Sequence, residues 1–431
     1  MAYRILLFLL LTIPISFKIE IAPNIRFLLQ EPFIIFFVFA CNYNIRKIQK
    51  NSYPFLFFNI AIILIVISTL ISLFFYFDVV GLIKGLKYLI YGLAVFTLFN
   101  NPKFLTVKLI DKVLKYGFLC VSFSLIYYFI TFLILDISWD SYVSKSTWIS
   151  RFMPTGLSNL TFKLSSLSFY RSGGNHGIYG SYLVVLLILS LFKFFKSRYR
   201  KSKLLVLLIL VNLSFITSRE SILLLFLTIF FYVFHHFLTR DWVNKKAILF
   251  SSIGVFLFLF VFIIWSPEIV ILHKIEHMVK VISETGGLDR SANYRFNTWH
   301  LLFSFLIMNP WNIITGIGFN RTRLGEILDH QERIIGQELF HVDLPESIYV
   351  ACLGYGGILS FLCIILFFIS LFYLLYNSGK ISRLFSFLLL GLMITNATGA
   401  SLFAELFISQ FGIVCALLIY KGKEIDEISY R

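Results

Sequence analysis

The chain has 431 residues, of which 58% are hydrophobic and only 14% are charged, and its mean hydropathy is +0.85. Soluble domains carry about 25% charged residues, so this composition excludes an ordinary soluble protein and indicates a surface that needs lipid as its solvent. The net charge of +16 would suit a nucleic-acid partner, but the basic residues lie in short connections between apolar stretches. That placement is typical of membrane topology signals, and we expect no nucleic-acid binding.

Long apolar stretches predict membrane-spanning helices. The uncharged stretches 54–76 and 247–265 are each roughly 20 residues long, which is enough to cross a bilayer as a helix, and they lack the alternation of a membrane barrel. We therefore predict an all-α, polytopic membrane protein with about twelve spans in a single integral membrane domain, 1–431. The expected spans are 5–17, 27–43, 54–76, 79–98, 114–135, 177–192, 204–218, 220–238, 247–265, 347–376, 384–398 and 402–420.

The distribution of Lys and Arg predicts the orientation. The basic connections and the tail are 44–53, 99–113, 193–203, 239–246, 377–383 and 421–431. In contrast, the short turns 77–78 and 399–401 carry no Lys or Arg. Because cytoplasmic connections are enriched in these residues, we expect a multi-pass membrane protein with both termini in the cytoplasm.

Two connections on the opposite, outer side are long. They cover 136–176 and 266–346, and loops of this length are uncommon unless they are folded or functional. The second contains an apolar segment, 296–308, bounded by Arg295 and by Asn309 with Pro310, which predicts a helix at the outer interface. The larger loop is therefore expected to be a partly helical periplasmic or extracellular element.

Two lysines fall inside an expected span. Lys84 and Lys87 are three residues apart, so they share one face of a helix, in the half that we place toward the outer surface. Charged groups at membrane depth are costly and mark functional sites. They either extend to the lipid headgroups or form an anion site for a lipid pyrophosphate.

Several arginines stand at the outer ends of expected helices. Arg219 opens the span 220–238, where the amides of a helix N-terminus and a guanidinium group together favour phosphate, although a plain polar turn is the alternative. Arg171 precedes a glycine-rich entry to the span 177–192. Arg290 and Arg295 precede Trp299 and His300, whose rings could stack on sugars, with simple surface decoration as the alternative.

The end of the large loop carries candidate bases. His341, Asp343 and Glu346 lie just before the span 347–376, and Glu405, at the outer end of the last span, is a further candidate. Neutral His or ionised Glu can accept a hydroxyl proton, although interfacial placement alone would explain the same residues. The cysteines lie in apolar runs without metal-type spacing, so neither a metal nor another cofactor is expected.

Three of these pieces resemble the O-antigen polymerase and O-antigen ligase superfamily. They are Thr-Ser-Arg at 217–219, the series Arg295, Trp299, Pro310, Gly316 and Gly318, and Leu-Gly-Tyr-Gly-Gly at 353–357. Arg171-Ser-Gly is similar to another element of the family. The match covers about 160–360, and the layout of twelve spans with a large late outer loop extends it over the chain.

The resemblance implies a GT-C-like fold and a metal-independent, inverting glycosyltransferase. Its substrate would be a glycan carried on undecaprenyl pyrophosphate at the outer face, with Arg219 and Arg295 gripping phosphate and Arg171 and Arg290 assisting. Where ligases carry a His-Asn pair, this sequence has Asp343, with His341 two residues away. We therefore favour a polymerase of O-antigen or capsule repeat units, for which a chain-length regulator is a candidate partner besides the bilayer.

Two alternatives remain open. One is a ligase-type transferase of the same family. The other is a flippase for lipid-linked oligosaccharide, although such transporters tend to have short loops and a charged central cavity, in contrast to the long outer loops here.

Overall fold

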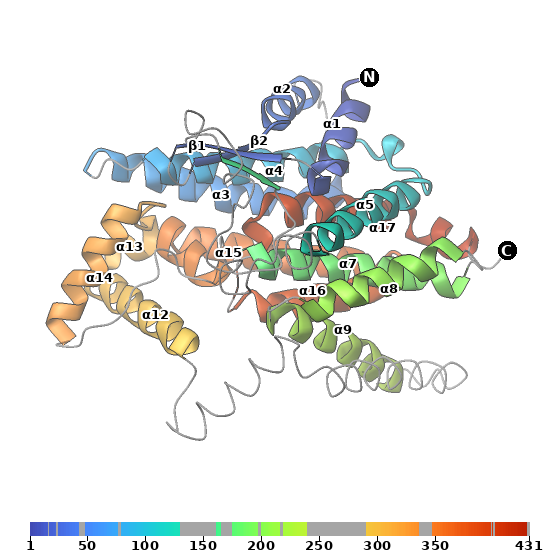
Figure 1. Ribbon diagram of the computed structural model, residues 1–431. Helices are drawn as coiled ribbons and strands as arrows, with labels where there is room; N and C mark the ends of the chain where they lie inside the picture. The colour runs from blue at the N-terminus through green and yellow to red at the C-terminus, as the bar shows by residue number, and fades with distance from the viewer. Residues whose placement is uncertain are drawn as a thin grey trace.

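The structure is a computed structural model, and the part of the chain that it describes is almost entirely helical (Figure 1). It describes residues 1–15, 17–22, 25–42, 48–75, 79–129, 161–164, 175–196, 200–215, 219–238, 290–335, 347–397, 399 and 401–428. The helices are α1 (Ala2–Leu11), α2 (Glu31–Asn42), α3 (Tyr53–Leu73), α4 (Val79–Phe99), α5 (Leu109–Phe129), α7 (Asn175–Lys196), α8 (Arg200–Phe215), α9 (Arg219–Leu238), α12 (Arg290–Met308), α13 (Pro310–Thr315), α14 (Arg321–Ile335), α15 (Ile348–Asn377), α16 (Lys380–Thr395) and α17 (Glu405–Ile428). Short 3-10 turns lie at Ile13–Ile15, Lys50–Ser52, Pro102–Phe104 and Ser401–Phe403.

Four helical segments are long and apolar enough to cross a membrane: Lys50–Leu73, Val79–Phe99, Ile348–Asn377 and Glu405–Glu427. Shorter apolar helices accompany them, including Gly177–Phe192 and Glu220–His235. The helical membrane character predicted from composition is therefore seen in the described residues. The larger number of spans and the GT-C-like fold stay predictions, and the expected span 247–265 lies outside the described residues.

The first expected span, 5–17, is wrong as a single helix. Helix α1 ends at Leu11, a 3-10 turn follows over Ile13–Ile15, and the chain then becomes extended. Pro14 explains the stop, because proline disfavours the helical conformation of the residue before it and cannot donate a backbone hydrogen bond. Similarly, the second span begins at Glu31, whose neighbour Pro32 suits the first turn of a helix.

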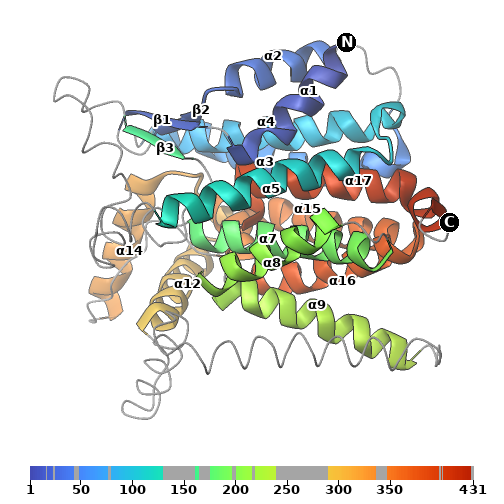
Figure 2. The ribbon, with the colours of Figure 1, turned by 45° about the vertical axis from the view of Figure 1, so that its right-hand side comes forward.

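Three short strands correct the expectation of a purely helical fold. Strand β1 (Phe17–Ala22) pairs antiparallel with both β2 (Ile25–Leu28) and β3 (Thr161–Leu164), in the order β2-β1-β3. The register sets Ile19 opposite Phe27 on one side and opposite Phe162 on the other. Figure 2 shows the sheet over the first half of α4.

The centre of the protein is the packing of α3 against α15. The ring of Phe367 lies 5.4 Å from those of Phe55 and Phe58, and the Ser360 hydroxyl donates to the Ala61 carbonyl at 3.0 Å. The opposite face of α15 exposes an apolar row at helical spacing: Leu359, Leu362, Leu366, Ile369 and Tyr373. An uninterrupted apolar row of this kind suits contact with lipid.

One end of the bundle joins segments that the sequence assigns to the cytoplasm. The Gln49 amide donates to Asn100 at 2.8 Å, and the Tyr420 hydroxyl donates to the Phe99 carbonyl at 2.7 Å. The amide of Lys380 donates to an Asp426 carboxylate oxygen at 2.5 Å, so the start of α16 is capped from the end of α17. Both termini lie toward this end (Figure 1).

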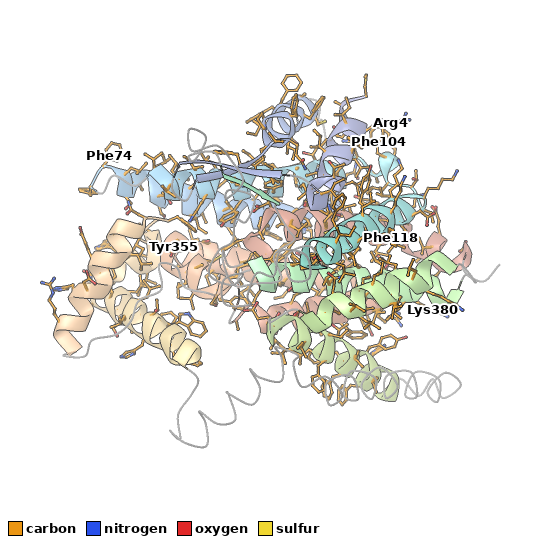
Figure 3. All side chains as sticks on the ribbon, in the orientation of Figure 1. Arg4, Phe74, Phe104, Phe118, Tyr355 and Lys380 are labelled. Carbon is orange, nitrogen blue, oxygen red and sulfur yellow. The ribbon has the colours of Figure 1, made fainter. Side chains whose placement is uncertain are left out.

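The opposite end carries α13, α14 and the sheet. Figure 3 shows Phe74 and Tyr355 toward this end and Lys380 toward the other. The described part of the large outer loop forms helices α12, α13 and α14, and the segment expected to be helical, 296–308, lies within α12. Helix α12 packs against α15, where the Leu302 side chain lies beside Gly354. The candidate site around Lys84 and Lys87 lies toward this end.

Candidate functional site

Lys84 and Lys87 project from one face of α4, as the three-residue spacing predicts, and both side chains are half-buried. The ammonium nitrogen of Lys84 lies 6.0 Å from the centre of the Phe319 ring. That of Lys87 lies 5.9 Å from the Phe27 ring in β2. Lys87 therefore contacts the sheet through Phe27, whereas Lys84 contacts the segment after α13 through Phe319.

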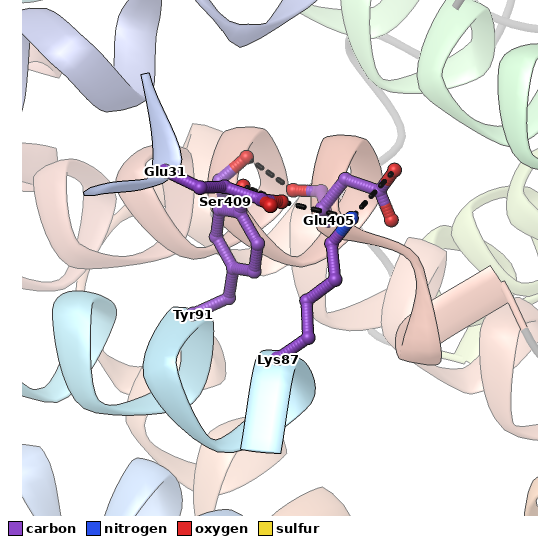
Figure 4. Close-up of polar contacts among 5 residues, drawn as sticks. All are labelled: Glu31, Lys87, Tyr91, Glu405 and Ser409. Atoms are coloured by element: carbon purple, nitrogen blue, oxygen red, sulfur yellow. Dashed lines mark hydrogen bonds and ion pairs between the residues drawn. The ribbon is translucent and has the colours of Figure 1, made fainter. Parts of the chain in front are cut away.

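Lys87 is held by two carboxylates from other helices (Figure 4). Its Nζ lies 2.8 Å from Glu31 Oε1, at the start of α2, and 3.9 Å from Glu405 Oε1, at the start of α17. Only 4% of the Glu31 side chain is exposed. Because these charges lie inside an apolar bundle, each carboxylate depends on the ammonium group to offset its lost hydration. The three residues therefore join α2, α4 and α17 at one point.

Two hydroxyl groups complete this cluster (Figure 4). The fully buried Tyr91, one turn beyond Lys87, donates its hydroxyl hydrogen to Glu31 Oε1 at 2.9 Å. The hydroxyl of Ser409 donates to the backbone carbonyl of Glu405 at 2.6 Å. Glu31 Oε2 is buried and has no hydrogen-bond partner among the described residues. We call Glu31, Lys87, Tyr91 and Glu405 the charged cluster.

The segment Gly316–Phe319 crosses the bundle beside Lys84. Its amides are bound by the protein interior: Ile317 donates to the Gly354 carbonyl at 2.8 Å, and Gly318 donates to the Tyr355 carbonyl at 3.0 Å. The amide of Phe319 donates to the Thr69 hydroxyl oxygen at 2.7 Å. A backbone segment can lie at this depth only when its polar groups are satisfied in this way. We call it the crossing segment.

Glycines make this close approach possible. A Cβ atom at Gly81 of α4 would collide with the Phe319 carbonyl oxygen, so α4 can touch the crossing segment only at a glycine. In α15, Gly357 has φ +74° and ψ −175°, which interrupts the helix just beyond Tyr355. The glycine pattern that the sequence shows at 353–357 therefore builds a docking place for backbone.

Aromatic rings connect the crossing segment to the charged cluster. The Phe319 ring lies 4.9 Å from Tyr355 and 6.2 Å from Tyr88. Tyr88 in turn stacks on Phe403 at 5.3 Å, two residues before Glu405. Since Tyr88 lies one turn beyond Lys84, the two lysines and Glu405 belong to one continuous region at this end of the bundle.

The start of α9 reaches the same end. The amide of Ile348, which opens α15, donates to the carbonyls of Asn396 and Gly399, each at 3.1 Å. The Glu220 carboxylate borders Gly399 so closely that an added Cβ would lie 2.7 Å from Oε2. Arg219, the residue before Glu220, therefore has its backbone near Gly399 and the start of α15. The structure does not describe its side chain.

The structure describes only some of the other site residues that the sequence predicts. Arg290 and Arg295 lie in α12, where their backbones but not their side chains are described. Trp299 is half-buried and packs 5.2 Å from Phe296, its indole N–H has no partner among the described residues, and His300 is exposed. Their roles toward a glycan stay predictions. Four further candidates, Arg171, His341, Asp343 and Glu346, lie outside the described residues.

Two members of the charged cluster were not predicted from the sequence. Glu31 lies within the expected span 27–43, where a single acidic residue is a signal for a partner of a membrane lysine. Tyr91 follows Lys87 at a spacing of four residues, which places it on the same helix face. Neither residue belongs to a recognisable motif.

The cysteines and the possible metal ligands can be placed for the described residues. The five cysteines are free, and those at 41, 120, 352 and 415 are buried. Within the described ranges, no three His, Cys, Asp or Glu residues are grouped so that they could hold a metal ion. Comparison with known proteins adds no family: no protein-family model and no curated protein sequence matches this chain.

Proposed function

We propose that the protein is a membrane glycosyltransferase that polymerises O-antigen or capsule repeat units. In this proposal a glycan moves from undecaprenyl pyrophosphate to another lipid-linked repeat unit at the outer face of the bacterial inner membrane. The observation that supports a site is the charged cluster beside Lys84, inside an apolar helical bundle. Ionisable groups at such depth are costly and are retained for function.

The two lysines suit different tasks in this reaction. Lys87 lies against Glu31 and Glu405, so we assign it to the organisation of the site. Lys84 lies one turn closer to the helix start and faces the crossing segment, so we assign it to the donor phosphates together with Arg219. As the sugar leaves pyrophosphate, negative charge grows on the phosphate oxygens, and cations already in place stabilise that transition state most.

The position of the site matches a donor that is anchored in lipid. An undecaprenyl chain keeps its pyrophosphate at the membrane surface, so the enzyme must bind that group at the level of the bilayer. The charged cluster joins α4 to the start of α17, and both helices are long enough to span a membrane. The helices α12 to α14, beyond α15, would then cover the glycan at the outer face.

The distribution of basic residues supports this orientation. The opposite end of the bundle carries lysines and arginines in its short connections and helix ends: Lys50, Lys103, Lys380, Arg383, Lys421 and Lys423. By the positive-inside rule, that end would face the cytoplasm, with both termini. The charged cluster would then face the periplasm, where a chain-length regulator could reach the growing polymer.

Replacing Arg219 with alanine is expected to lower the rate of polymerisation about 10²–10³-fold, because one pre-placed phosphate ligand is lost. In a strain that depends on this protein, long-chain glycan should disappear while single repeat units remain on the cell. Gel analysis of the surface glycan measures both.

The control is Arg383→Ala, which removes an arginine at the other end, where its guanidinium lies 4.9 Å from the Tyr376 ring. That variant should keep the normal chain lengths. Unchanged long chains in the Arg219→Ala strain would count against the phosphate role. Accumulation of untranslocated lipid-linked units, in contrast, would favour the flippase alternative, and loss of transfer to a core lipid alone would favour the ligase.

A further inference from the structure

The two carboxylates that share Lys87 differ in their surroundings (Figure 4). Glu31 lies closer to the ammonium nitrogen, at 2.8 Å against 3.9 Å for Glu405, and it also accepts the Tyr91 hydroxyl. The Glu31 side chain is 4% exposed, whereas that of Glu405 is 12% exposed. Glu31 is thus held in the interior, and Glu405 is the more exposed of the two carboxylates, with its Oε1, which faces Lys87, buried.

Glu405 is also firmly positioned. It is the first residue of α17, and its backbone carbonyl accepts the Ser409 hydroxyl at 2.6 Å. Lys87 approaches its carboxylate from α4, and Lys87 is itself fixed by Glu31. An ion pair in this weakly hydrated setting stabilises the negative charge of the carboxylate and restricts its rotation.

The neighbours of Glu405 link it to the cation that we assign to phosphate. Phe403 stacks on Tyr88, and Tyr88 follows Lys84 by one helical turn. Lys84 and Glu405 therefore lie at the same end of the bundle, and the contact between Tyr88 and Phe403 connects their neighbourhoods. An inverting transfer needs a cation on the leaving-group side of the anomeric carbon and a base on the opposite side, so we assign the first role to Lys84 and the second to Glu405.

We propose that Glu405 is the general base of this transfer, and that Lys87 and Glu31 position it; the inference rests on the function proposed above. The Glu405 carboxylate takes the proton of the acceptor hydroxyl while the hydroxyl oxygen forms its bond to the anomeric carbon. The bond from that carbon to the pyrophosphate oxygen breaks on the other side, and its electron pair leaves with undecaprenyl pyrophosphate. The proton then passes from Glu405 to water.

Azide provides a direct test, because it is a nucleophile that is already anionic and needs no base. With azide as acceptor, a bond forms from nitrogen to the anomeric carbon, the bond to pyrophosphate breaks, and no proton moves. The purified protein is reconstituted in liposomes with a lipid-linked repeat unit, and polymer and glycosyl azide are both quantified by mass spectrometry. The variants are Glu405→Gln, Arg219→Ala and, as a matched control on the far turn of α17, Glu424→Gln.

For Glu405→Gln, polymer formation should fall about 10²–10⁴-fold while formation of glycosyl azide stays at the wild-type rate. Arg219→Ala should lose both reactions, and Glu424→Gln should keep both. Polymer formation by Glu405→Gln at the wild-type rate would overturn the assignment and leave the proposed function intact. So would a loss of both reactions by a folded Glu405→Gln protein. A wild-type protein that performs neither reaction would instead overturn the proposed function.

A second variant covers the case in which Glu405→Gln does not fold. Glu405→Asp keeps the negative charge beside Lys87 but withdraws the carboxylate by one methylene group. It should elongate polymer at least about tenfold more slowly than the wild type, because a base must lie within hydrogen-bonding reach of its proton, and it should form glycosyl azide at the wild-type rate. Equal polymer formation by this variant and the wild type would reject Glu405 as the base.

Discussion

Replacing Lys87 with methionine should destabilise the protein by about 3–5 kcal/mol, the cost of breaking a buried ion pair by removing one partner. Methionine keeps the length of the side chain but leaves Glu31, at 4% exposure, without its ammonium partner. Titration with SDS in mixed micelles, followed by tryptophan fluorescence, measures the change in the free energy of unfolding.

Two further variants test whether the loss of stability comes from the buried ion pair. The double variant Glu31→Gln with Lys87→Met removes a carboxylate along with the ammonium group, so it should recover a large part of the lost stability. Lys112→Met, on the exposed surface of α5, should be nearly neutral. Equal unfolding free energies for Lys87→Met and Lys112→Met would show that the charged cluster does not contribute to the fold.

Replacing Gly357 with alanine should cost about 2–5 kcal/mol, since two penalties combine. The first is the positive φ of 74°, which an L side chain adopts only with strain. The second is a collision of the new Cβ with the Ile314 carbonyl oxygen at the end of α13. Because α13 leads directly into the crossing segment, this region should also lose its docking on α15, and proteolysis within 310–320 should accelerate.

Gly325→Ala is the matched control for this change. Gly325 lies in α14 with no atom within 4 Å of the position of an added Cβ, so alanine should be tolerated there or should stabilise the helix slightly. If Gly357→Ala matches Gly325→Ala in both stability and protease resistance, the interruption of α15 does not hold the crossing segment.

The helical membrane character could be predicted from sequence because it depends on local composition. An apolar run such as 54–76 has few alternatives to a helix, and α3 occupies Tyr53–Leu73. The spacing of Lys84 and Lys87 likewise predicted a shared helix face. The segments expected together in the cytoplasm, around Phe99, Lys380 and Tyr420, do meet at one end of the bundle.

Features that depend on contacts between residues far apart in the sequence could not be predicted. Nothing local indicates that Lys87 pairs with Glu31 and Glu405, because the three residues lie on different helices, far apart in the sequence. The strand Phe17–Ala22 was hidden because an averaged apolar window does not distinguish alternation from a helical pattern. The crossing segment was visible only as a glycine pattern, since its partners come from α3, α4 and α15.

The proposed joining of lipid-linked glycans can be measured directly with the purified protein in liposomes, given a single undecaprenyl-pyrophosphate-linked repeat unit as the sole substrate. We expect a ladder of longer lipid-linked chains, with one undecaprenyl pyrophosphate released for each bond formed. Repeat units that stay single, whether or not they cross the bilayer, would contradict it.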